Sequence, residues 1–165
     1  KHGSVKILES LGNLGVFPPY YEHKNIFKAG FLNVIQWMSH PCRLKHQLIL
    51  QPMHLGFAAY FGHLHIIQWM VQHTPLRVYM FTIFSALSGG HVHIVQWLLN
   101  NCDKNEMYTP RQEDSDNAVS SGHLQVVEWI AEQYHIIPSD YAINYAAKKG
   151  HSDIIDWYCG LPLSC

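Results

Sequence analysis

Histidine is the residue type that most invites a chemical interpretation, because 13 of the 165 residues are histidines. Imidazole is the commonest metal ligand in proteins, so the sequence raises the hypothesis of a His-dependent metalloenzyme. Two pairs have i, i+2 spacing, His63 with His65 and His91 with His93. Residues two apart on a helix point to different faces, so we expect neither pair to share a metal ion. Zinc motifs of the H-E-x-x-H type are absent.

Other catalytic motifs are absent as well. The sequence contains no G-x-S-x-G nucleophile motif and no phosphate-binding G-x-x-x-x-G-K loop. The four cysteines form no C-x-x-C pair, which indicates a reducing compartment rather than a disulfide-stabilised domain. They are Cys42, Cys102, Cys159 and Cys165. We therefore predict a protein that is not an enzyme and needs no cofactor or metal, with the metalloenzyme as the alternative.

The composition narrows the class of partner. Lys plus Arg is 11 and Asp plus Glu is 12, a formal net charge of -1. Proteins that bind nucleic-acid phosphates carry a basic excess, so we expect no nucleic acid. No apolar run approaches the ~20 residues that span a bilayer, so we expect no membrane insertion. Hydrophobic residues make up 48% of the chain, and we predict one folded domain over residues 1–165, monomeric and cytoplasmic.

A repeated segment organises the chain: a glycine, then paired apolar residues, then a tryptophan seven positions after the glycine. The five clear copies open at Gly30, Gly62, Gly90, Gly122 and Gly150, and a less regular copy opens at Gly3. The distance between successive clear copies alternates between 32 and 28 residues. Self-similarity at a fixed period is the signature of a repeat architecture.

Each copy carries the pattern of a helix. Apolar residues fall two, four, five, seven and eight positions after the glycine, which is a wide stripe at helical period. The adjacent apolar pair, such as Ile66-Ile67, breaks the alternation that a strand requires. The stripe predicts second helices at about 31–39, 63–72, 91–99, 123–133 and 151–159. We expect neighbouring units to cover the stripe and to bury its tryptophans between them.

A first helix is predicted before each glycine. Its start is marked by proline in Thr74-Pro75, Thr109-Pro110 and Pro138-Ser139, because proline is favoured at the first helical position. The segment from Thr109 to Gln112 also fits a capping box. Small residues before the turn, such as Ala58-Ala59, allow the two helices of a unit to approach closely. The prediction is an all-α fold of stacked helix-turn-helix units.

The repeated segment resembles the ankyrin repeat. In the last unit, Ala146-Ala147, Gly150-His151 and Ile154-Ile155 are similar to the end of that family's inner helix and to its outer helix. The form that ends in tryptophan is similar to diverged ankyrin arrays of large DNA viruses, such as the African swine fever virus multigene families, and of some protists. The resemblance covers nearly the whole chain. It implies an α-solenoid of ankyrin-like repeats, and another type of α-solenoid is the alternative.

The chain also departs from the family pattern. Pro110 lies 12 residues before Gly122, where the family has eight, so we expect a first helix about one turn longer. The units are shorter than the ~33 residues of the family, so we expect short or missing β-hairpin fingers.

The resemblance implies a non-catalytic scaffold that binds a partner protein through the concave face built from the first helices. A viral or parasite origin implies that the partner is a host protein. The candidate binding positions lie on the first helices and their ends, most of them just before the glycine, where residue types differ from unit to unit. They are Lys28, Tyr60, Phe61, Ser88, Ser120, Ser121, Tyr145, Lys148 and Lys149.

Two further interpretations stay open. Glu113, Asp114 and Asp116 form an acidic cluster that is either the solvated first turn of a helix or a docking patch for a basic partner. The chain starts mid-repeat at Lys1 and has an apolar ending at 161–163, whereas finished arrays carry polar caps. This favours a fragment of a longer array, and the alternative function is a passive scaffold segment of a larger multidomain protein.

Overall fold

The computed structural model describes residues 23–40, 48–101 and 108–161, and these ranges contain ten helices and no strand. The first helices are α2 (His23–Ala29), α4 (Pro52–Tyr60), α6 (Met80–Ser88), α8 (Gln112–Ser120) and α10 (Asp140–Lys149). The second helices are α3 (Leu32–Ser39), α5 (Leu64–His73), α7 (Val92–Asn101), α9 (Leu124–Tyr134) and α11 (Ser152–Cys159). The all-α prediction is confirmed for these ranges, and the second helices lie within two residues of their predicted bounds. The copy at Gly3, three of the cysteines (Cys42, Cys102 and Cys165) and most of the apolar ending lie outside the described residues.

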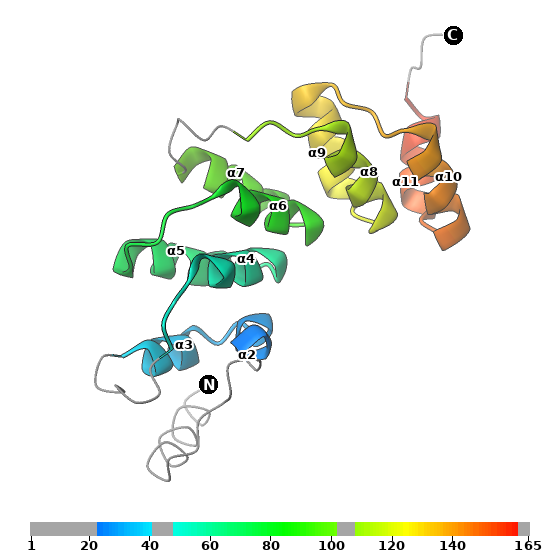
Figure 1. The fold of residues 1–165 in the computed structure, drawn as a ribbon. Helices are drawn as coiled ribbons and strands as arrows, with labels where there is room; N and C mark the ends of the chain where they lie inside the picture. The colour runs from blue at the N-terminus through cyan, green and yellow to red at the C-terminus, as the bar shows by residue number, and fades with distance from the viewer. Residues whose placement is uncertain (1–22, 41–47, 102–107, 162–165) are drawn as a thin grey trace.

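The helices form pairs, and the pairs stack in chain order from α2 and α3 to α10 and α11 (Figure 1). All first helices lie on one side of the stack, which we call the first-helix side. Contacts between successive first helices are more extensive than contacts between successive second helices. The units therefore approach each other most closely on the first-helix side.

The repeat glycine ends each first helix and redirects the chain. All five glycines have left-handed φ angles between 71° and 82°, a region that side chains disfavour. In one unit, the Gly62 N–H donates to the Ala59 carbonyl at 3.2 Å and the His63 N–H donates to the Ala58 carbonyl at 2.9 Å. These bonds satisfy carbonyl groups at the end of α4 in the pattern of a Schellman motif.

The predicted start of α8 is two residues too early, and the predicted capping residue is wrong. The helix begins at Gln112 with Arg111 at the N-cap, and the Asp114 carboxylate accepts the Arg111 N–H at 2.8 Å. Thr109 therefore takes no part in a capping box.

The other prolines give a mixed result. The Thr74-Pro75 prediction is also wrong, since Thr74 ends α5 and α6 begins only at Met80. The Pro138-Ser139 prediction gives the approximate start of α10, but Ser139 is the N-cap, its hydroxyl accepts the Ala142 N–H, and Pro138 lies before the cap and not at the first helical position. The fixed φ of proline suits extended connections as well as helix starts. The first helices of the four later units consequently have 9 or 10 residues and gain no extra turn.

The core lies along the middle of the predicted stripe. Positions four, five and eight after the glycine are buried in four units, at Val34, Ile35, Met38, Ile66, Ile67, Met70, Ile94, Val95, Leu98, Val126, Val127 and Ile130. Of the tryptophans, only Trp129 is buried, with 8% of its surface exposed. The other four are partly buried against the edge of the core. The prediction that all tryptophans are buried between units is wrong. The seventh position lies at the edge of the apolar stripe, and the neighbouring unit covers mainly the middle of that stripe.

Candidate functional site

The histidine that follows Gly62, Gly90 or Gly122 contacts the preceding unit. His63 Nε2 lies 3.0 Å from the Lys28 carbonyl oxygen, and His123 Nε2 lies 3.1 Å from the Ser88 carbonyl oxygen. The ring of His91 hydrogen-bonds to the Tyr60 backbone in the same way. A carbonyl only accepts, so Nε2 of His63 and of His123 carries the proton and donates it. Each of these histidines therefore fixes the backbone of a predicted binding residue.

Each of these imidazoles also lies against the glycine of the preceding unit. A Cβ atom placed on Gly30, Gly62, Gly90 or Gly122 would lie 2.5, 2.7, 2.7 or 2.8 Å from the nearest ring atom of the next histidine. These four glycines are therefore required both for their φ angle and for the close approach of the next unit. At Gly150 no described atom lies within 4 Å of that position, so the last turn is uncovered.

The histidine pairs are closer than the sequence predicted. The ring centroids are 5.8 Å apart for His63 and His65, and 5.9 Å apart for His91 and His93. The first histidine of each pair precedes the helix, so helical geometry does not separate the two rings. His65 Nε2 lies 3.3 Å from the Gly30 carbonyl oxygen, where it adds a second bond to the same turn as His63. No group of three or more His, Cys, Asp or Glu within the described ranges is arranged to hold a metal ion.

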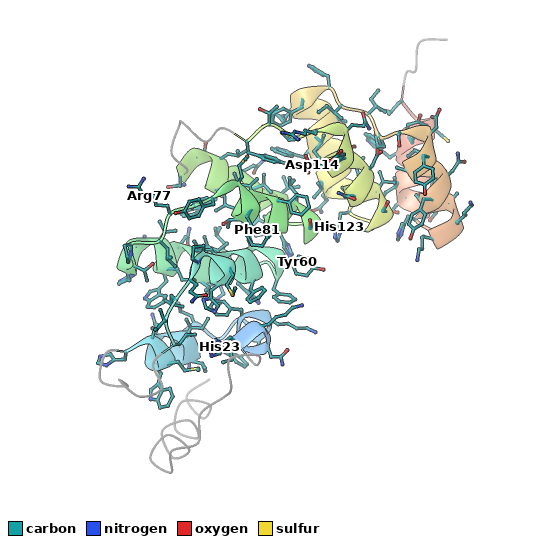
Figure 2. All side chains as sticks on the ribbon, in the orientation of Figure 1. His23, Tyr60, Arg77, Phe81, Asp114 and His123 are labelled. Carbon is teal, nitrogen blue, oxygen red and sulfur yellow. The ribbon has the colours of Figure 1, made fainter. Side chains whose placement is uncertain are left out.

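The predicted binding residues form one row of repeat positions, at or near the C-terminal ends of the first helices, and Figure 2 labels Tyr60 among them. Tyr60 and Phe61 form one contact within this row, with ring centroids 5.1 Å apart. Lys149 forms another, with its Nζ atom 5.5 Å from the centroid of the Tyr145 ring. The row also contains Lys28, Ser88, Ser120, Ser121 and Lys148, at the ends of α2, α6, α8 and α10. Its two ends belong to opposite ends of the stack, so the row does not make one pocket.

Large apolar side chains are exposed on α4 and α6, and of these the sequence prediction named only Tyr60. We call this group the apolar surface: Met53, Tyr60, Met80, Phe81 and Phe84, which are 40%, 47%, 56%, 56% and 42% exposed. The sequence signal was available, because apolar residues stand nine positions before Gly62 and both nine and six positions before Gly90. That spacing of three places Phe81 and Phe84 on one face of α6.

The residue six positions before the repeat glycine sets how closely successive first helices pack. At Gly56 a Cβ atom would collide with the ring of Phe81, so only glycine lets α6 lie this close to α4. The equivalent residue in α6 is Phe84, which is bulky. The equivalent residue in α8 is Asp116, whose carboxylate accepts the Ser139 N–H at 2.8 Å and the Ser139 hydroxyl at 2.7 Å. The sequence thus builds three different junctions.

A groove of about 670 Å³ opens at the junction that contains Phe84. One wall is formed by Met80, Phe81 and Phe84 of α6, and the other includes Pro110, Arg111 and Glu113 before and within α8. A second hollow of about 700 Å³ lies beside the C-terminal ends of α3 and α5. Only the first groove continues the apolar surface.

Two buried polar residues, His54 and Asp114, close capping boxes at the starts of α4 and α8. His54 is fully buried and its Nδ1 atom accepts the Gln51 N–H at 2.9 Å, the role that Asp114 has in α8. Its ring stacks on Phe27 with centroids 5.1 Å apart. Burial, and next the proximity of His23, lower the pKa of His54 to about 4. His54 is therefore neutral at pH 7 and closes a capping box.

The comparisons with known proteins do not assign this chain to a family. A scan against models of protein families finds none that matches this sequence, and a search of curated proteins finds no match either. Among the described residues, no helix has the length and apolar character that crossing a membrane requires. The ankyrin resemblance therefore stays a prediction.

Proposed function

We propose that this chain is a non-catalytic scaffold of ankyrin-like repeats that binds a partner protein through its first-helix side. The observation that supports this proposal is the apolar surface on α4 and α6. Contiguous exposed apolar patches mark interaction sites more often than ordinary surface. Aromatic residues and methionine, the types that make up this surface, are enriched in the cores of protein interfaces.

The energetics favour a protein partner. Full burial of a side chain such as Phe81 or Met80 contributes about 1.5–3 kcal/mol, so a few of them can supply most of an interface. Both residues belong to the packed helix α6, whose backbone is already ordered before binding. A partner therefore loses little affinity to the ordering of this backbone.

The proposed interface is completed by a polar rim made of the polar members of the row, which are Lys28, Ser88, Ser120, Ser121, Lys148 and Lys149. Interface rims are polar and solvent-accessible, and rim charges act mainly on specificity and association rate. Because the first helices pack more closely than the second helices, we take the first-helix side as the concave face. The proposal includes a monomeric scaffold that acts in the cytoplasm. If the viral resemblance holds, its partner is a host protein.

Site-specific photo-crosslinking tests this function. A photoreactive phenylalanine analogue replaces Phe81 on α6 or, as the control, Gln96, which is exposed on α7. We expect position 81 to crosslink a distinct protein from cell extract, identified by mass spectrometry, and position 96 to crosslink none. Equal capture from both positions, or capture from neither, would contradict the proposal.

A second candidate function, a structural segment that stacks on a further helical pair, is favoured by the end of the stack. Ala147 is exposed on α10, whereas the equivalent Ala59, Leu87 and Val119 are buried against the next unit. Together with the uncovered Gly150, this is a unit face of the kind that neighbouring units cover elsewhere in the chain. Crosslinking from position 147 without crosslinking from position 81 would favour this candidate.

A further inference from the structure

We propose that the groove between α6 and α8 binds a short segment of the partner in which an aromatic or large aliphatic side chain lies within four residues of a Lys or Arg. This inference rests on the proposed protein-binding function and names the chemistry of the partner at one place.

The groove follows from the residue at one position of the repeat. Gly56 lets α4 and α6 meet closely, and Asp116 joins α8 to α10 through two hydrogen bonds from Ser139. Phe84 does neither of these things at the junction of α6 with α8. Its ring is 42% exposed and lines both the groove and a smaller hollow next to it. The identity of the side chain at this position of the repeat, Phe84, therefore determines that the groove is open.

The walls of the groove suit an apolar anchor. Met80 and Phe81 are each 56% exposed beside Phe84, and Pro110 is buried in the facing segment. A volume of about 670 Å³ falls within the ~300–1,000 Å³ typical of pockets that enclose small ligands, so it can hold large side chains. Burial of one such side chain there would remove apolar surface of both partners from water.

The charges at the groove select a basic neighbour for that anchor. Arg111, Glu113 and Asp114 line the facing wall, which gives one positive and two negative groups. The Asp114 carboxylate accepts the Arg111 N–H, and the Tyr108 hydroxyl also lies against it. Glu113 is exposed, and it lines the groove. The excess of carboxylates attracts Lys or Arg of a partner and repels Asp or Glu. Figure 2 labels Phe81 on α6 and Asp114 on α8.

A random 12-residue peptide library displayed on phage and selected on the full chain tests this proposal. We expect enriched peptides with an aromatic or large aliphatic residue within four positions of Lys or Arg. A synthetic peptide of the consensus sequence should bind at least tenfold more weakly to Phe84→Ser and to Met80→Ser. It should bind about threefold more weakly to Glu113→Lys at low salt, and as in the wild type to the control Gln96→Ser on α7. Circular dichroism checks that each variant is folded. If Phe84→Ser does not fold, the peptide affinity of Met80→Ser decides the test.

Several outcomes would overturn the proposal. They are the absence of enrichment, a consensus with acidic instead of basic residues, and binding that persists in both groove variants. Self-association that Phe84→Ser abolishes, seen by analytical ultracentrifugation, would identify a second copy of the chain as the occupant and would also overturn it. A protein crosslinked from position 81 that binds Phe84→Ser as it binds the wild type would remove the groove site and keep the scaffold function.

Discussion

The junction between α4 and α6 and the junction between α6 and α8 join equivalent first helices in different ways. At the first junction Gly56 has no side chain, so the ring of Phe81 occupies the space where a Cβ atom would lie. The two helices therefore pack against each other. At the second junction the equivalent residue is Phe84, and a groove of about 670 Å³ lies between the helices. The same scaffold thus makes a closed or an open junction according to one residue.

The two junctions show that the stacking of the units and the spacing of their first helices are specified by separate positions. The buried residues four, five and eight positions after the glycine are branched aliphatics, leucine or methionine in each of the first four described units. The residue six positions before the glycine changes from Gly56 to Phe84 to Asp116 and finally to Asn144. Repeated core positions hold the units together, and this varied position decides what lies between their first helices.

The largest expected effect concerns pH and the two capping boxes, closed by His54 in α4 and by Asp114 in α8. Burial lowers the pKa of His54 in the folded state to about 4 from its ordinary value of about 6.5, so folding favours the neutral form. Its contribution is complete above pH 6.5 and is lost as the pH falls to 4, by about 3 kcal/mol at pH 4. Urea unfolding at a series of pH values measures this loss.

The control for this prediction is His54→Gln, which has no titrating ring at that position. Its free energy of unfolding should fall less steeply between pH 6.5 and 4 than that of the wild type. An identical pH dependence of the two proteins would show that His54 does not carry the effect.

The closed junction should respond strongly to added volume. Gly56→Leu forces side-chain atoms into the place of the Phe81 ring, and overpacking of this kind costs about 2 kcal/mol. Phe84→Leu at the open junction should change the free energy of unfolding by less than about 0.5 kcal/mol. Chemical denaturation of both variants makes the comparison, and equal losses would contradict the role of this position as a spacer.

The hydrogen-bonded junction should show an intermediate effect. Asp116→Ala removes the acceptor of the Ser139 N–H and hydroxyl, at a cost of about 1.5 kcal/mol for bonds to a charged group. Asn144→Ala, at the equivalent exposed position of α10, should cost less than about 0.5 kcal/mol. Thermal melts of the pair check this, and a larger loss for Asn144→Ala would be inconsistent with the account.

The smallest expected effect separates a covered turn from an uncovered one. Gly122→Ala and Gly150→Ala share the strain of a left-handed φ, but only at Gly122 does the new Cβ meet an imidazole, that of His151. We expect Gly122→Ala to cost about 1 kcal/mol more than Gly150→Ala, as a modest overpacking term. Equal losses in urea unfolding would mean that the histidine yields without cost or that another group covers Gly150.

Much of the fold could be predicted from the sequence because each second helix is specified by residues within its own segment. The glycine with its left-handed φ and the stripe that contains Ile66-Ile67 give both the turn and the buried face. The tryptophan prediction failed because an apolar stripe shows which face of a helix is buried, but not how much of that face the neighbouring unit covers. Pro75 and Pro110 misled because proline favours extended connections as much as helix starts.

The candidate site was less predictable. Exposure of Phe81 and Phe84 depends on the distance between α6 and its neighbours, which is a property of the stack and not of any one segment. The contact of His63 with Lys28 likewise joins residues 35 apart in the sequence. Once the repeat is aligned, however, the exchange of Gly56 for Phe84 is visible in the sequence and marks the odd junction.

Protein binding through the first-helix side is decided by isothermal titration of the crosslinked partner into wild type, Phe81→Ser and Gln96→Ser. We predict that Phe81→Ser weakens binding at least tenfold, about 1.4 kcal/mol, and that Gln96→Ser binds within twofold of wild type. Unchanged affinity of Phe81→Ser, or an equal loss in both variants, would contradict the proposed function.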